Sequence, residues 1–217
     1  MTECESATVD LIIAGPPYNI GTRYGENPDD VPFELYKEII SSVMEECFRV
    51  LKREGAMVVE AADSVLMNGR YVQLAGLIQS LCLQKGFYLS ERHINFSKSE
   101  KGKELPEDDR WGMDYSTIQN AHSNCHQWMV FKKIQSDFAG GGIFYIDYLE
   151  TEVHPCPFPD QTIELLLSKY YKSGMRVLDP FMGISGLGRK VVLSGGEYQG
   201  YEIDPDIYNQ ATRTLEE

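Results

Sequence analysis

Four consecutive residues, Gly15-Pro16-Pro17-Tyr18, have types that suit the recognition of a flat amine. They follow the apolar run Asp10–Ala14, which predicts a buried strand. The two prolines fix φ and remove two backbone N–H donors, while their carbonyls stay available as acceptors. Tyr18 adds a flat aromatic surface beside those acceptors. The loop therefore predicts a site for a planar group that carries an NH2, although Gly15 lacks the polar side chain that such a site would use.

A second group of residues near the C-terminus has the layout of a nucleotide site. The segment Asp179-Pro180-Phe181-Met182-Gly183 lies between an expected buried strand at 175–178 and an expected helix that runs to about 193. Glu202 follows at the end of the next expected strand, about 20 residues beyond the turn. Glycine lets the backbone approach a ligand closely, and an acid at the end of the second strand accepts from ribose hydroxyls. The alternative is a tight turn followed by a surface glutamate.

Strands that alternate with helices must position both groups. Pro32 begins an expected helix that closes at Lys52–Gly55, and the remaining expected helices cover 71–85, 160–171 and 205–215. Further strands are expected at 56–60, 87–96, 127–132 and 198–201, and a loop at 63–69. This alternation predicts an α/β fold with a mixed, mostly parallel sheet of about six or seven strands, covered by helices on both faces. The strands 87–96 and 127–132 have no helix between them, so we expect them to pair antiparallel at one edge.

The other polar segments carry weaker signals. Residues 97–126 form an expected long polar loop, and Lys98, Lys101, Lys103 and Arg110 within it suit nucleic-acid contact and a solvated loop equally well. Residues 134–153 form a short insert with a flexible glycine joint at 140–142. His122, Cys125 and His126 lack a fourth partner at zinc spacing, so we interpret them as part of the polar loop and expect no metal site.

Composition predicts a single folded domain over residues 1–217, because 42% of the residues are hydrophobic and 24% are charged. The formal net charge is −13, so any basic surface for nucleic acid must be local or supplied by a partner. Five scattered cysteines favour reduced thiols and a cytoplasmic location. The polar start does not resemble a signal peptide, and no apolar run reaches the roughly 20 residues of a membrane span.

These motifs together resemble a known family. Asp179–Gly183 with Glu202 resembles motifs I and II of S-adenosylmethionine-dependent DNA amino-methyltransferases, and Gly15–Tyr18 resembles their motif IV, which is normally Asp-Pro-Pro-Tyr or Ser-Pro-Pro-Tyr. The segment Arg49–Gly55 is similar to the helix end of that family, and His154–Pro159 is similar to the segment before motif I. The order, with the Pro-Pro-Tyr half first, is that of the circularly permuted β class. The resemblance covers nearly the whole chain.

The resemblance implies a role for each motif. Its fold is the class I, Rossmann-like methyltransferase sheet, and its cofactor is S-adenosyl-L-methionine. Gly15, Pro16, Pro17 and Tyr18 would form the catalytic loop, in which the Pro16 carbonyl accepts from the target amine and Tyr18 stacks on a base flipped out of duplex DNA. The cofactor side would be held by a second set of residues: Pro157, Phe158, Asp179, Pro180, Phe181, Gly183, Glu202 and Ile203. The implied reaction is methyl transfer to an exocyclic amine of a DNA base, with N4 of cytosine slightly preferred over N6 of adenine. The resemblance also implies a restriction-modification setting, and it makes residues 134–153 a very short target-recognition insert.

Departures from the family pattern keep alternatives open. Gly15 removes one hydrogen-bond acceptor, which predicts a loss on the order of a few kcal/mol at the reacting centre. Ser185 stands where a second glycine is expected, with Gly186 as a substitute after a one-residue shift. Only nine residues precede Asp10, so we expect the motif III edge strand to be absent. A catalytically inactive, methyltransferase-like binding or regulatory subunit is the alternative function. A partner subunit or a homodimer stays open, and no membrane partner is expected.

Overall fold

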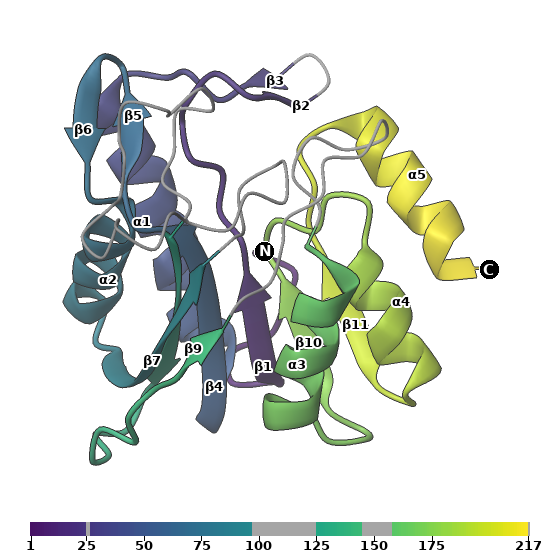
Figure 1. The fold of residues 1–217 in the computed structure, drawn as a ribbon. Helices are drawn as coiled ribbons and strands as arrows, with labels where there is room; N and C mark the ends of the chain where they lie inside the picture. The colour runs from purple at the N-terminus through teal and green to yellow at the C-terminus, as the bar shows by residue number, and fades with distance from the viewer. Residues whose placement is uncertain (25–26, 97–124, 145–157, 217) are drawn as a thin grey trace, which may run out of the picture.

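The computed structural model describes residues 1–24, 27–96, 125–144 and 158–216, and its centre is a seven-stranded sheet (Figure 1). The strand order is β11-β10-β1-β4-β8-β7-β9. The strands are β1 (Val9–Ala14), β4 (Leu51–Ala62), β7 (Tyr88–Phe96), β8 (Cys125–Lys132), β9 (Ile143–Phe144), β10 (Arg176–Asp179) and β11 (Glu197–Gly200). Four neighbouring pairs are parallel and two are antiparallel. The predicted mixed, mostly parallel sheet is confirmed.

The antiparallel strand pair is confirmed as well. β8 pairs antiparallel with both β4 and β7, and β9 then adds a short parallel strand outside β7. At the other end of the sheet, no strand in the described ranges pairs with the outer side of β11.

Helices cover both faces of the sheet because successive strand residues point to opposite sides. On one face, α1 (Phe33–Val50) and α2 (Leu74–Gln84) pack on Ile12, Val59 and Phe131. On the other face, α3 (Asp160–Tyr170) and α4 (Gly186–Leu193) pack on a second cluster that includes Trp128 and Val177. Helix α5 (Pro205–Glu216) follows β11 and lies beside α4 (Figure 1). No helix within the described ranges has the length and apolar content needed to cross a membrane.

Two predicted boundaries in the first half were wrong. Helix α1 ends at Val50, and the residues expected to close it belong to β4 instead. Leu51 is fully buried in extended conformation and pairs with Val9, while the Lys52 ammonium lies 2.6 Å from the Asp10 carboxylate. The pairing with β1 and the burial of Leu51 therefore favour a strand, although the basic residues and glycine at 52–55 predicted the end of a helix.

The predicted loop at 63–69 was also wrong, because it contains a β-hairpin. β5 (Val65–Met67) and β6 (Arg70–Val72) pair antiparallel, so α2 begins at Leu74 rather than at residue 71. Asn68 and Gly69 form the turn with φ of 48° and 75°. Two consecutive left-handed residues are what a tight hairpin turn needs, and Asn-Gly is the strongest sequence signal for it. A second small ribbon, β2 (Arg23–Tyr24) with β3 (Asn27–Pro28), follows the Pro-Pro-Tyr loop.

The predicted polar loop at 97–126 ends earlier than expected. Cys125 and His126 are buried and begin β8, while residues 97–124 lie outside the described part of the chain. In the 134–153 segment, the glycine joint is held against β7, because Gly140 and Gly142 carbonyls accept from the backbone N–H groups of Arg92 and Ile94. A Cβ on Gly141 would collide with the Arg92 carbonyl, so glycine permits this close approach. The single-domain assignment and the role of this segment in target recognition stay predictions.

Candidate active site

The Pro-Pro-Tyr loop and the loop after Asp179 follow adjacent parallel strands and lie at the same edge of the sheet. β1 and β10 pair in register through Leu11 with Val177 and Ile12 with Leu178, and the loops begin directly after these strands. From β10 the chain continues outward to β11, whereas from β1 it continues in the opposite direction to β4. This is the point where strand order reverses, and ligands of open α/β sheets bind beyond the carboxyl ends of the strands there (Figure 1).

The two proline carbonyls of the first loop have different roles. The Pro17 carbonyl accepts a hydrogen bond of 2.9 Å from the Tyr36 hydroxyl of α1, and Tyr36 is 3% exposed. Burial is the main cause that raises the pKa of this phenol, so the hydroxyl stays protonated and donates. One acceptor site of the Pro17 carbonyl is therefore used inside the fold, and the Pro16 carbonyl is the candidate acceptor for the target amine.

The chain beyond Tyr18 is fixed by a buried asparagine. Asn19 has a φ of 57°, its backbone N–H donates to Asp29 Oδ2 at 2.9 Å, and its side-chain amide donates to the Val31 carbonyl at 2.8 Å. Burial raises the pKa of Asp29, although backbone donors, with Asn19 the largest, lower it. The β2–β3 ribbon reaches the other half of the protein, since the Asn27 amide lies 3.5 Å from an Asp204 carboxylate oxygen. These hydrogen bonds fix the chain on the C-terminal side of the Pro-Pro-Tyr turn.

An aromatic ring occupies the space that a side chain at position 15 would enter. A Cβ added to Gly15 would lie 2.8 Å from Cζ of Phe158 and 3.3 Å from its Cε2. Phe158 precedes α3 and belongs to the apolar cluster on the α3 face. Gly15 therefore lacks a polar side chain, and it also faces an apolar ring from a residue far away in the sequence.

The second loop presents a buried acid at the end of β10. Asp179 is 2% exposed, its Oδ1 accepts from the Phe181 backbone N–H at 3.0 Å, and the Tyr198 hydroxyl lies 3.5 Å from its Oδ2. Burial is the largest cause that raises the pKa of Asp179 to about 7, with a further contribution from the Glu202 charge. A nearby cation would stabilise the ionised form of this buried carboxyl.

Glu202 organises the turn that follows Asp179. Its Oε2 accepts from the Gly183 backbone N–H at 3.1 Å, and its Oε1 accepts from the Asp204 backbone N–H at 2.9 Å. Each carboxylate oxygen has two acceptor sites, so further donors can still bind. Ile203 beside it is 78% exposed, which leaves an apolar surface next to the acid. Gly183 has a φ of 50°, where glycine adopts the left-handed turn without strain.

Ser185 takes the backbone conformation expected of the second glycine of this turn. Its φ is 63° and it is fully buried, while Gly186 is the first residue of α4. The predicted one-residue shift to Gly186 is therefore wrong, because the left-handed position stays at 185. Asp204 caps the last helix, because its Oδ1 accepts from the backbone N–H groups of Asp206 and Ile207.

The structure brings most of the predicted site residues to one edge of the sheet. Those described there are Gly15, Pro16, Pro17, Tyr18, Phe158, Asp179, Pro180, Phe181, Gly183, Glu202 and Ile203. Pro157 and residues 154–156 lie outside the described part of the chain, as does His122 of the weak metal pattern. Within the described ranges, no group of three or more His, Cys, Asp or Glu side chains is arranged to hold a metal ion.

Sequence reasoning missed two buried polar residues beneath the Pro-Pro-Tyr loop. Glu60 of β4 is 4% exposed and His126 of β8 is 3% exposed, and both contact the Tyr18 hydroxyl. The signal in the sequence was a lone acid in the apolar run Met57–Ala62. His126 was expected in a polar loop, but it lies in a strand, and its ring is buried against Glu60.

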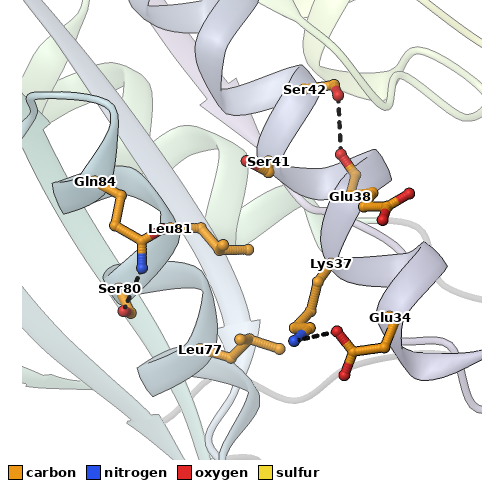
Figure 2. A pocket seen from close by; sticks show the side chains of 9 residues that line it. All are labelled: Glu34, Lys37, Glu38, Ser41, Ser42, Leu77, Ser80, Leu81 and Gln84. Atoms are coloured by element: carbon orange, nitrogen blue, oxygen red, sulfur yellow. Dashed lines mark hydrogen bonds and ion pairs between the residues drawn. The ribbon is translucent and has the colours of Figure 1, made fainter.

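A pocket between α1 and α2 lies outside this edge of the sheet (Figure 2). Lys37, Leu77 and Leu81 line it, and the Lys37 ammonium lies 2.5 Å from Glu34, which is also in the lining. Glu34 and Glu38 are exposed and Lys37 pairs with Glu34 on the same helix, so the pocket lacks the converging polar groups of an active site.

The family of the chain follows from comparison with known proteins. The family model described as DNA methylase, of the N6/N4 methyltransferase type, matches residues 9–213. DNA adenine methyltransferase YhdJ of Escherichia coli K12 is 26% identical over 96% of this chain and 76% of its own length. Type II methyltransferase M.HpaI of Haemophilus parainfluenzae is 44% identical over 25% of this chain. That match spans only 18% of the length of M.HpaI.

Solved structures show the same fold at low sequence identity. The cytosine-N4-specific PvuII DNA methyltransferase superposes with a TM-score of 0.70 at 16% identity, covering 99% of this chain and 88% of that one. TTHA0409 of Thermus thermophilus, a DNA modification methylase complexed with S-adenosyl-L-methionine, gives a TM-score of 0.68 at 20% identity, covering 99% and 88%. With the family match over residues 9–213 and the Pro-Pro-Tyr half first, the chain belongs to the S-adenosyl-L-methionine-dependent N6/N4 DNA methylase family.

Proposed function

We propose that this protein transfers a methyl group from S-adenosyl-L-methionine to an exocyclic amine of a DNA base. The observation that carries the proposal is the meeting of the Pro-Pro-Tyr loop and the Asp179 loop at the ends of adjacent strands β1 and β10. A donor held by one loop would face an amine held by the other. YhdJ, a sequence relative, is named an adenine methyltransferase, and the PvuII enzyme, a structural neighbour, is cytosine-N4-specific, so proteins similar to this chain include both types. We retain the slight preference for N4 of cytosine.

The residues of the second loop fit the cofactor. When bound, S-adenosyl-L-methionine supplies an electrophilic methyl group on a sulfonium centre. We assign Asp179 to its cationic amino group, since a buried carboxyl with a raised pKa gains from a positive partner. Glu202 is assigned to the ribose hydroxyls and exposed Ile203 to the adenine ring. The turn at Phe181 and Gly183 would pack beside it, with Pro180 fixing the start of the turn.

The residues of the first loop act on the amine. The Pro16 carbonyl accepts one N–H and so draws the nitrogen lone pair away from the ring, which makes the nitrogen a better nucleophile. Tyr18 supplies the face on which the flipped base stacks. Pro17 contributes rigidity, because its carbonyl is held by Tyr36. Gly15 leaves room for the Phe158 ring as an apolar wall. Positioning of the two reactants then lowers much of the barrier.

Direct assay of the purified protein tests this function. Tritiated cofactor is incubated with cytosine-only, adenine-only and mixed duplexes, and the digested nucleosides are analysed by mass spectrometry. We expect N4-methylcytosine or N6-methyladenine in the digest, with no label in duplexes that lack the target base. Absence of both modified bases from genomic and synthetic duplexes, in protein that binds the cofactor by calorimetry, would exclude the proposal.

A second candidate function is supported by Gly15 and Phe158. Because the ring fills the space of the missing acceptor, a cofactor-binding protein without transfer activity would show the same loop. Such a protein would act as a regulatory or structural subunit. Calorimetric binding of S-adenosyl-L-methionine without methyl transfer, together with co-purification of a catalytic methyltransferase chain, would favour this second function over the first.

A further inference from the structure

A buried Tyr–Glu–His cluster lies directly under the Pro-Pro-Tyr loop. The Tyr18 hydroxyl donates to Glu60 Oε2 at 3.1 Å and lies 3.2 Å from His126 Nδ1. The same His126 nitrogen lies 2.5 Å from Glu60 Oε1, and because a carboxylate only accepts, the imidazole N–H donates to it. Three elements far apart in sequence, the loop, β4 and β8, therefore converge on one carboxylate.

Burying the polar side chains of this cluster in the core is unfavourable for the stability of the fold. Glu60 is 4% exposed and lies between Val59 and Ala61, opposite Trp128. His126 is 3% exposed and lies opposite Ala62 on one side and Asn95 on the other. Taking a carboxylate and an imidazole out of water has a penalty that pairing offsets only in part, and apolar residues of similar size often stabilise a core better. A polar cluster retained at such a place is expected to fix geometry instead of adding stability.

The geometry it fixes is the orientation of the Tyr18 ring. At the backbone end of this residue, the preceding prolines limit φ and the following Asn19 is held by Asp29. At the far end, the hydroxyl is held by Glu60 and His126. The two rings of Tyr18 and His126 are 6.2 Å apart between centroids and tilted by 46°. The aromatic face is thus held at both ends.

We propose that Glu60 and His126 are positioning residues that hold the Tyr18 ring as the stacking surface for the target base. The inference rests on the proposed function, since it assigns Tyr18 to the base. Glu60 accepts from the hydroxyl and His126 keeps the Glu60 carboxylate in place. The ring is then ordered before the base arrives, so less conformational freedom is lost on stacking.

The same chain contains a matched control cluster on the same face of the sheet. The Tyr170 hydroxyl of α3 donates to Glu91 Oε2 at 3.0 Å and lies 3.2 Å from His93 Nε2. Glu91 and His93 belong to β7, and in the strand register Trp128 lies between Glu60 and His93. This second cluster joins α3 to β7 and does not contact the Pro-Pro-Tyr loop. Tyr170→Phe therefore removes an equivalent hydroxyl without touching Tyr18.

Kinetic variants test the positioning role. We expect Tyr18→Phe to lower kcat about tenfold and Glu60→Ala about 100-fold, since small misplacement of a reacting group costs up to that factor. Glu60→Gln restores most of the rate, because its amide oxygen still accepts from the Tyr18 hydroxyl. Cofactor Kd stays within about twofold in all of them, and Tyr170→Phe leaves kcat unchanged. Equal losses in Tyr170→Phe and Tyr18→Phe, or a fall in cofactor affinity matching that in kcat, would overturn the role.

A spectroscopic test works even without turnover. Protein with ring-labelled tyrosine is studied by NMR, and the Tyr18 signals are assigned by their loss in Tyr18→Phe. In the wild type and in Glu60→Gln, we expect the Tyr18 ring signals to show restricted ring motion. In Glu60→Ala, we expect these signals to be averaged by faster ring motion, while the Tyr170 signals stay unchanged. Tyr18 signals that are equally restrained in Glu60→Ala refute the inference. A wild type that methylates no DNA refutes the proposed function instead, and the NMR result still decides whether Glu60 orders Tyr18.

Discussion

The two loops that meet at the sheet edge differ in what they offer a ligand. The loop after β10 begins next to the buried carboxyl of Asp179, and its Gly183 N–H donates to Glu202. The loop after β1 has Gly15 where its family has a polar residue, and the Phe158 ring occupies that space. In the function proposed above, the cofactor half would keep charged recognition, whereas the amine half would use one backbone acceptor and an apolar wall. Cofactor binding and methyl transfer are therefore expected to respond to different substitutions.

The largest effect is expected on the cofactor side. Asp179→Ala should weaken S-adenosyl-L-methionine binding about 100-fold, because it removes the charged partner of the methionine amino group. Calorimetric titration measures this change, with Glu164→Gln as a control at an exposed acid of α3. The Glu164 variant should bind like the wild type. A small effect of Asp179→Ala would show that the β10 loop does not hold the cofactor as assigned.

Changes at the amine half should depend on Phe158. Gly15→Ser alone brings a Cβ within 2.8 Å of the ring, so we expect no gain in kcat and a lower free energy of unfolding. Gly15→Ser combined with Phe158→Ala gives the hydroxyl room, and kcat should then rise about tenfold or more over the Phe158→Ala variant. Initial rates at saturating cofactor measure this.

The outcome of this pair decides what the glycine does. A rate gain in Gly15→Ser with Phe158 intact would mean that the ring moves aside freely, and that the two positions are not coupled. Cofactor Kd, measured in parallel for the single and double variants, should change by less than about threefold if the halves are separable. A larger change would contradict the separation of cofactor binding from methyl transfer.

Cofactor affinity should also depend on pH through Asp179. Its pKa in the folded protein is raised to about 7, above the ordinary 3.8, so the carboxyl is protonated below about 7. A cationic amino group binds the ionised form better, so binding releases a proton. Affinity should therefore rise as pH increases toward 7, by up to about tenfold per unit, and level off above it. Asp179→Asn should remove this dependence, and an unchanged slope in that variant would assign it to another group.

The smallest effect is expected at Ser185. Its φ of 63° is a conformation that costs an L-residue about 1–2 kcal/mol, while glycine adopts it without strain. Glycine also gains freedom in the unfolded chain, so Ser185→Gly should raise the free energy of unfolding by less than about 1 kcal/mol. Chemical denaturation measures the difference. Loss of stability would show that the Ser185 side chain contributes more than its backbone conformation costs.

The sequence predicts local features of this fold well and long-range contacts poorly. The strand–turn–helix at Asp179 is predictable because its residues are consecutive, and the alternation of elements predicts the mixed sheet. The contact of Phe158 with Gly15 is not, since it joins residues more than a hundred positions apart. The same holds for Glu60 and His126, which strand pairing brings together. Asn68-Gly69 is different: the local signal was present, and the expectation of a loop overlooked it.

The hydrogen bonds of Glu202 have a thermodynamic consequence for ligand binding. Both carboxylate oxygens accept from backbone N–H groups, those of Gly183 and Asp204. Immobilising a flexible side chain on binding costs about 0.5–1.5 kcal/mol, and here that entropy is lost during folding instead. Calorimetry should accordingly show a small entropic penalty from this side chain on binding. The entropy cost of ordering Glu202 lowers the free energy of unfolding instead of the binding affinity.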